Sequence, residues 1–224
     1  MRISDSGIFP KDVQEILKAL YSIGFFESAI LIGSWVILLY KEPFGIDYSL
    51  RTLDIDFGVK NTISPKARPI DPVFTELGFI EVLDRSGASG YTKAGLSVDF
   101  LVHRKGGKTK DVLNIPQWEL KAIPVPYINL MFEFTFQAEF DEFKVRAPLP
   151  EAYFTHKMII AQRRVEPGKK EKDLDQCSII AEKLNEKRLQ EVINSVPIGP
   201  GTRKNLRASC KAIGFSTKKL GLKD

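Results

Sequence analysis

In Arg51-Thr52-Leu53-Asp54-Ile55-Asp56-Phe57-Gly58-Val59, apolar and acidic residues alternate in the way typical of a β-strand. Side chains two residues apart on a strand point to the same face, so Asp54 and Asp56 leave this strand together. Neighbouring carboxylates repel each other, and a divalent cation offsets that repulsion because hard oxygen ligands suit Mg²⁺. The pair therefore predicts a metal site. The alternative is an exposed strand face that carries solvated acids.

Two flanking segments add to this site. Upstream, an apolar strand over 29–32 ends in Gly33-Ser34. The glycine lets a backbone approach a phosphate, and Ser34 offers a hydroxyl and an amide at a helix start, where anions bind well. Ser34 can equally be a capping residue after a turn glycine. Downstream, the apolar strand 96–102 contains a third acid, Asp99.

These motifs, in this order, resemble those of the nucleotidyltransferase superfamily, which has the polymerase-beta-like fold. The hallmark is an apolar residue, Gly, then Gly or Ser, followed by Asp-x-Asp and a later Asp on a neighbouring strand. Here it corresponds to Ile32-Gly33-Ser34, Asp54-Ile55-Asp56 and Asp99. The resemblance implies an α+β fold, with a mixed β-sheet core, flanking helices and an inserted loop over 41–49.

A second resemblance covers the stretch after the core. Residues 150–157, Arg163 and 170–174 are similar to the Lys…Arg…Lys-Asp pattern of bacterial nucleotidyltransferases related to abortive-infection toxins. It implies that Lys157 and Lys172 contact the nucleotide. For Lys172 and the acid that follows it, the alternative is an ordinary helix N-terminus. Arg51 could pair with a phosphate or balance the two acids that follow it, and the sequence leaves both options open.

The pattern changes near residue 148 and predicts two units, a mixed sheet with helices over 1–148, which the resemblance implies is the nucleotidyltransferase core, and a small helical domain over 149–224. In the first unit we expect helices at 10–23, 34–40 and 71–77, the last capped by Asp71. We expect strands at 29–32, 53–59, 79–84, 90–93, 96–103, 134–140 and 143–147. In the second unit we expect a helix at 152–163, a linker at 165–168, one long helix at 173–195 and a short helix at 203–212.

The composition of this 224-residue chain is ordinary for a globular protein, with 43% hydrophobic and 27% charged residues. The longest apolar run is too short for a bilayer, no secretory signal is evident, and the two cysteines lack metal-type spacing. We therefore expect a cytoplasmic protein with no membrane partner. The net charge is +5, and seven basic residues with no acid lie between Arg203 and Lys223. This segment indicates a polyanionic partner such as RNA, or else a solvated basic tail.

The resemblance implies an enzyme that uses Mg²⁺ (or Mn²⁺) to transfer a nucleoside monophosphate from a nucleoside triphosphate to a hydroxyl group. Two ions clamp the attacking and leaving oxygens in such reactions. Asp54 and Asp56 would hold both ions, and Asp99 would complete one site and orient the acceptor. RNA, protein and small-molecule acceptors all remain open, as does the oligomeric state. The alternatives are a toxin–antitoxin component and a catalytically silent member that binds nucleotide or RNA.

Overall fold

A computed structural model describes residues 1–4, 6–50, 52–64, 67–104 and 111–222. Its centre is a mixed sheet, as expected from the sequence. The main path runs in the order β1 (Ala29–Ile32), β2 (Asp54–Val59), β5 (Leu96–His103), β4 (Ser89–Lys93) and β3 (Ile80–Leu83). β2 and β5 are parallel, whereas β1 pairs antiparallel with β2, and β4 pairs antiparallel with both β5 and β3.

The second half of β5 has a different neighbour from the first half. β4 pairs with the beginning of β5, and β7 (Leu120–Val125) pairs in parallel with its end. β6 (Leu113–Ile115) forms a short antiparallel hairpin with β7. The sequence analysis missed β6, β7 and the following helix α4 (Asn129–Glu133) because each is too short to show a clear period.

One layer of helices covers the sheet near the N-terminus. It consists of η1 (Ser6–Ile8), α1 (Lys11–Ser22), η2 (Phe25–Glu27), η3 (Ser34–Tyr40), α2 (Lys41–Phe44) and α3 (Asp71–Glu76), with a further turn η4 (Pro116–Trp118) near the β6–β7 hairpin. α1 buries one apolar stripe, which is why the helical period was readable. The inner face of the sheet meets this layer through aromatic contacts such as Phe25 on Phe57.

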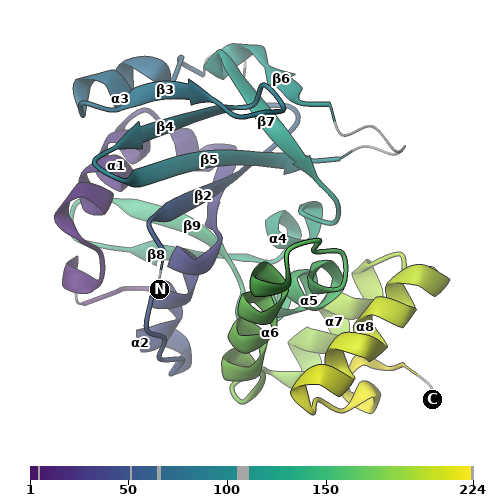
Figure 1. Ribbon diagram of the computed structural model, residues 1–224. Helices are drawn as coiled ribbons and strands as arrows, with labels where there is room; N and C mark the ends of the chain where they lie inside the picture. Colours follow the sequence, from purple (N-terminus) through teal and green to yellow (C-terminus); the bar gives the residue numbers. More distant parts are fainter. Residues whose placement is uncertain (5, 51, 65–66, 105–110, 223–224) are drawn as a thin grey trace.

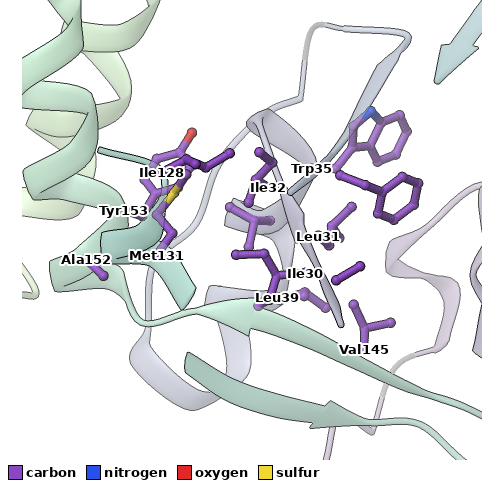
Figure 2. Close-up of a cluster of buried hydrophobic side chains, with 14 of the residues drawn as sticks. Ile30, Leu31, Ile32, Trp35, Leu39, Ile128, Met131, Val145, Ala152 and Tyr153 are labelled. Carbon is purple, nitrogen blue, oxygen red and sulfur yellow. The ribbon is translucent and has the colours of Figure 1, made fainter. Parts of the chain in front are cut away.

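The late hairpin of β8 (Thr135–Glu139) and β9 (Lys144–Pro148) packs against β1 rather than joining the main sheet. Figure 2 shows the cluster at this junction, where Leu31 lies near Val145 of β9, and Met131 and Tyr153 continue the apolar contact toward the C-terminal helices. This continuous packing fixes the helical part against the sheet.

The C-terminal part is a bundle of α5 (Pro150–Ala161), α6 (Pro167–Ala181), α7 (Glu186–Ser195) and α8 (Pro200–Ile213), followed by η5 (Thr217–Leu220) (Figure 1). Every residue of α5 is buried, because α4, α6, α7 and α8 all pack against it. Helix α5 is therefore the central helix of the bundle, and it contributes residues to one wall of the site described below.

Several expected boundaries were wrong. The single helix expected over 173–195 is two helices, because Asn185 starts α7 by accepting a hydrogen bond from Arg188 N at 3.0 Å. The expected linker at 165–168 is shorter, since α6 begins at Pro167. Asp71 is the first residue of α3 and not its cap, and residues 34–40 form a 3₁₀ helix. Within the described ranges, no helix is long and apolar enough to span a bilayer.

Candidate active site

The parallel pairing of β2 with β5 places the three predicted acids on one wall. Asp56 lies opposite Asp99, and Asp54 lies opposite Ser97. One cavity of about 250 Å³ contacts all three acids, and it is also lined by Gly33, Ser34, Lys157 and Lys172. Seven of the eight predicted site residues therefore border the same space. Arg51 is outside the described residues.

Gly33 and Asp56 approach each other closely. Gly33 has φ +69°, a left-handed conformation that side chains rarely adopt, and a Cβ at this position would lie 2.9 Å from the Asp56 Cγ and closer still to Oδ2. The glycine is thus required by the backbone and by the carboxylate together. The Gly-Ser turn is built around the second acid of the Asp-x-Asp pair.

Asp54 is held by two hydroxyl groups. Ser97 Oγ donates to its Oδ1 at 2.7 Å, and Thr52 Oγ1 donates to its Oδ2 at 3.1 Å. Among the residues that the structure describes, no three Asp, Glu, His or Cys side chains are gathered closely enough to hold a metal ion. The three acids share a wall without forming a closed cluster, so the metal role of the three acids stays a prediction.

The electrostatics of this wall favour binding of positive charge. The pKa of Asp56 is raised to about 6, chiefly by burial and also by the charges of Asp99 and Asp54, against the lowering effect of Lys157 and Lys172. Burial and then the charge of Asp54 also raise the pKa of Asp99. Both carboxylates would ionise more readily beside a cation.

The opposite wall comes from α5 and α6 and is cationic. Lys157, Arg164, Lys169 and Lys172 all line the cavity. Sequence analysis missed Arg164 and Lys169: the family pattern pointed to Arg163, and Lys169 lies between the expected linker at 165–168 and the helix expected from 173. Acids on one side and cations on the other create a cavity in which a metal and a polyphosphate could each find complementary charge.

Lys157 has a buried partner. Its Nζ donates to Asp173 Oδ1 at 2.5 Å, and Arg164 Nε donates to Asp173 Oδ2 at 2.8 Å. Burial works to raise the pKa of Asp173, but the two cations and their hydrogen bonds outweigh it and hold the pKa below its usual range. Asp173 lies inside α6, so the interpretation of this pair as a helix N-terminus was wrong.

A second buried network connects Ser34 to the helical bundle. Gln176 Nε2 donates to Ser34 Oγ at 2.8 Å and to the Tyr48 hydroxyl at 3.1 Å. Tyr153 OH donates in turn to Gln176 Oε1 at 2.8 Å. Gln176 was missed by sequence analysis, because its complete burial depends on how α6 packs against the core. The turn at Ser34 is therefore fixed to α6.

Part of the cavity lining is apolar. Leu101, Val125, Ile128, Met131 and Ile160 line the cavity together with the His156 ring. Neither ring nitrogen of His156 makes a hydrogen bond of normal geometry to a residue that the structure describes, and burial, followed by the charge of Lys157, lowers its pKa to about 3. His156 is thus a neutral imidazole at neutral pH.

Comparison with known proteins agrees with this geometry. The family model described as "Nucleotidyltransferase" matches residues 11–196, which include the sheet, the cavity and most of the helical bundle. The chain belongs to this nucleotidyltransferase family. Among curated proteins, no significant match was found.

A solved structure shares the nucleotidyltransferase fold. It is an antigenic nucleotidyltransferase-like protein from Paracoccidioides brasiliensis, with a TM-score of 0.54 and 13% sequence identity, and the alignment covers 99% of this chain and 95% of that one. At this identity the likeness extends to the fold alone. Both the core and the helical bundle are therefore shared architecture.

The basic C-terminal segment of this nucleotidyltransferase is integral to its bundle. Arg203, Lys204, Arg207 and Lys211 are exposed on α8, and Lys218 and Lys219 on η5, where Lys219 pairs with Glu186 at 2.6 Å; Lys223 lies outside the described residues. The other face of this segment buries Leu206, Cys210 and Leu220. The segment is therefore not a free solvated tail, and its charges lie on a packed helix.

Proposed function

We propose that the chain transfers a nucleoside monophosphate from a nucleoside triphosphate to a hydroxyl acceptor, with a divalent metal as cofactor. One observation carries the proposal: one cavity is lined by three acids from β2 and β5 and by four cations from α5, α6 and the turn between them. Family membership supports the transfer itself. The metal and the acceptor are inferred from the chemistry of the walls.

The donor set suits Mg²⁺ or Mn²⁺, because all three candidate ligands are carboxylates. The raised pKa values of Asp56 and Asp99 give the same indication, since burial and then the neighbouring acids disfavour their ionised forms, which a cation would stabilise. Asp54, Asp56 and Asp99 would hold the metal, with Asp54 exchanging its hydroxyl contacts for the ion. The metal would neutralise the charge that accumulates on the reacting phosphate.

The protein's own groups would bind and orient the triphosphate. Among the described residues Lys172 makes no ion pair, and Lys169 pairs only with the exposed Glu166 at the start of its own helix, at 3.2 Å, so both ammonium groups could meet phosphate oxygens. Lys157 is anchored by Asp173, which fixes its ammonium group at the edge of the acids. Gly33 leaves room for the backbone to come close to a phosphate, and Gln176 holds the adjacent Ser34 in place. The apolar part of the cavity lining is suited to the nucleobase.

The experiment is a transfer assay. The full-length protein is incubated with each α-labelled nucleoside triphosphate and total RNA, with Mg²⁺, with Mn²⁺, or with a chelator. The proposal expects label on a macromolecule and release of pyrophosphate, both abolished by the chelator. Binding of triphosphate without any transfer, on RNA, protein or small-molecule acceptors alike, would instead favour a silent nucleotide-binding member.

A further inference from the structure

A second cavity lies next to the first and is larger, at about 490 Å³. Its walls come from the end of β5, the start of α4 and the ends of α5 and α7. The segment between β7 and α4 separates the two cavities. Val125 and Ile128 line the first cavity, and Pro126 and Tyr127 between them line the second. The size is within the usual range for ligand sites, about 300–1,000 Å³.

The two cavities follow each other along β5 and along α5 with the turn after it, which supply lining residues to both. Asp99, Leu101 and His103 occupy the same face of β5, and the first two line the first cavity while His103 lines the second. Helix α5 runs alongside, with Lys157 and Ile160 in the first cavity and Arg163, just beyond the helix end, in the second. His103 is four residue positions beyond Asp99 along the strand, roughly 13 Å at ~3.3 Å per residue. A ligand that reaches both would be extended.

The second cavity is cationic. Arg104 and Arg163 both line it, and none of the residues lining it is acidic. Within the described part of the chain, neither arginine makes an ion pair with a carboxylate. Two guanidinium groups without an acidic partner favour an anionic ligand, and arginine is suited to phosphate because its donors form a planar fork.

The cavity also contains a fixed aromatic ring. The Arg163 guanidinium lies over the Tyr127 ring, with 5.2 Å from Cζ to the ring centroid. Tyr127 has φ +62°, an unfavourable backbone conformation for an aromatic residue, and its hydroxyl is 2.7 Å from Thr202 Oγ1 at the start of α8. Such strain is typical of functional positions. The exposed Arg203 and Lys204 follow Thr202 directly and extend the positive surface.

We infer that the second cavity binds the phosphate backbone of a single-stranded RNA acceptor whose terminal hydroxyl lies at the acids of the first cavity. This inference rests on the proposed function, because it gives the acceptor of that reaction a binding site. Positive grooves that contain an aromatic ring are typical of single-strand binding. Two arginines without acidic partners beside an aromatic ring fit a phosphate backbone better than a protein acceptor. Their distance from the acids suits an extended single strand of RNA.

The test measures RNA binding separately from nucleotide binding. A fluorescein-labelled single-stranded RNA of about 12 nucleotides is titrated with the full-length protein by fluorescence anisotropy at several salt concentrations. Arg163→Ala and Arg104→Ala should each weaken binding by about tenfold and lower the salt slope by about 0.7 for each lost phosphate contact. Arg163→Lys should keep the salt slope but lose part of the affinity.

Arg85→Ala is the matched control, because Arg85 is exposed in the β3–β4 turn and lines neither cavity. It should change RNA affinity by less than about twofold. The affinity of each arginine variant for Mg²⁺–ATP should stay within about twofold of the unmodified protein, and thermal melts should show that all variants are folded. Equal losses in Arg85→Ala and Arg163→Ala would overturn the inference, and so would a matching loss of ATP affinity.

The outcomes also separate this inference from the proposed function. Transfer of label to a protein or a small molecule, with no RNA binding, would overturn the RNA site and leave nucleotidyl transfer intact. Specific RNA binding through Arg104 and Arg163 without any transfer would support the site and contradict the enzymatic proposal.

Discussion

The Asp56 carboxylate lies against the α-carbon of Gly33, in the position that a β-carbon at residue 33 would need. This contact joins the end of β1 to the acid pair on β2. In the sheet, Ile32 of β1 is paired with Asp56 of β2. The Gly-Ser turn and the Asp-x-Asp pair are separate in the sequence, yet they form one structural unit.

Gly33→Ala should therefore displace Asp56 and lower the free energy of unfolding by about 2–3 kcal/mol, combining left-handed strain with a steric clash. Gly45→Ala is the control, because Gly45 has φ +65° and nothing within 4 Å of the added carbon. It should cost only about 1 kcal/mol. Urea unfolding measures both, and equal losses would show that the contact with Asp56 is unimportant.

Asp56→Asn should stabilise the metal-free protein at pH 8 by about 1–2 kcal/mol. The pKa of Asp56 is about 6 in the folded chain and near 3.8 when unfolded, so its ionisation opposes folding as the pH rises from 4 to 6. The gain should be complete above pH 6 and disappear near pH 4. Solvent reaches part of the Asp56 side chain and screens its charge, so the gain in the free energy of unfolding is smaller than the full pKa difference would give.

The control for this pH profile is Asp84→Asn. Asp84 accepts hydrogen bonds from Ser86 and Ala88, and the Ser86 hydroxyl is the main cause of its lowered pKa. Its substitution should destabilise the protein at neutral pH, the opposite sign. If the two substitutions changed stability in the same direction, the electrostatic account of Asp56 would be wrong.

Asp173→Asn should destabilise the bundle by about 3 kcal/mol, because it leaves Lys157 buried beside a neutral group. Lys157→Met should cost less, since Asp173 keeps Arg164 as its partner. Chemical denaturation of both variants gives the comparison. An Asp173→Asn variant as stable as the parent protein would show that Lys157 is not held by this pair.

The buried imidazole predicts acid sensitivity. The pKa of His156 is about 3 in the folded chain and near 6.5 when unfolded, so the unfolded state binds one more proton between these values. Stability should fall by about 1.4 kcal/mol per pH unit from pH 6 toward pH 4 on this account. His156→Phe should flatten the profile by that slope, and an unchanged slope would exclude His156 as its source.

The sequence was sufficient for the parts of the site that lie on regular strands. The two-residue spacing of Asp54 and Asp56 and the apolar run around Asp99 directly encode which face each acid occupies, and β2 and β5 confirm it. The mixed sheet followed by a helical part was predicted for the same reason. Periodicity reports faces well because it is a local property.

The cationic wall was less predictable because it depends on how helices pack. Lys157 and Asp173 are 16 residues apart, and nothing local to either shows that they pair. The same holds for Gln176 and Ser34, which are joined across 142 residues. The break between α6 and α7 was missed because Asn185, a polar residue on an amphipathic pattern, reads as a surface position until its capping bond is seen.

The most direct test compares acid variants in the transfer assay. Asp54→Asn, Asp56→Asn and Asp99→Asn are assayed beside Asp141→Asn for Mg²⁺-dependent pyrophosphate release and transfer of labelled nucleotide, after thermal melts confirm that each is folded. Asp141 is an exposed acid in the β8–β9 turn that does not line the cavity. The account predicts that each of the three wall substitutions lowers the rate by at least about 100-fold, while Asp141→Asn keeps the rate of the parent protein. Folded wall variants that transfer nucleotide as fast as Asp141→Asn would contradict it.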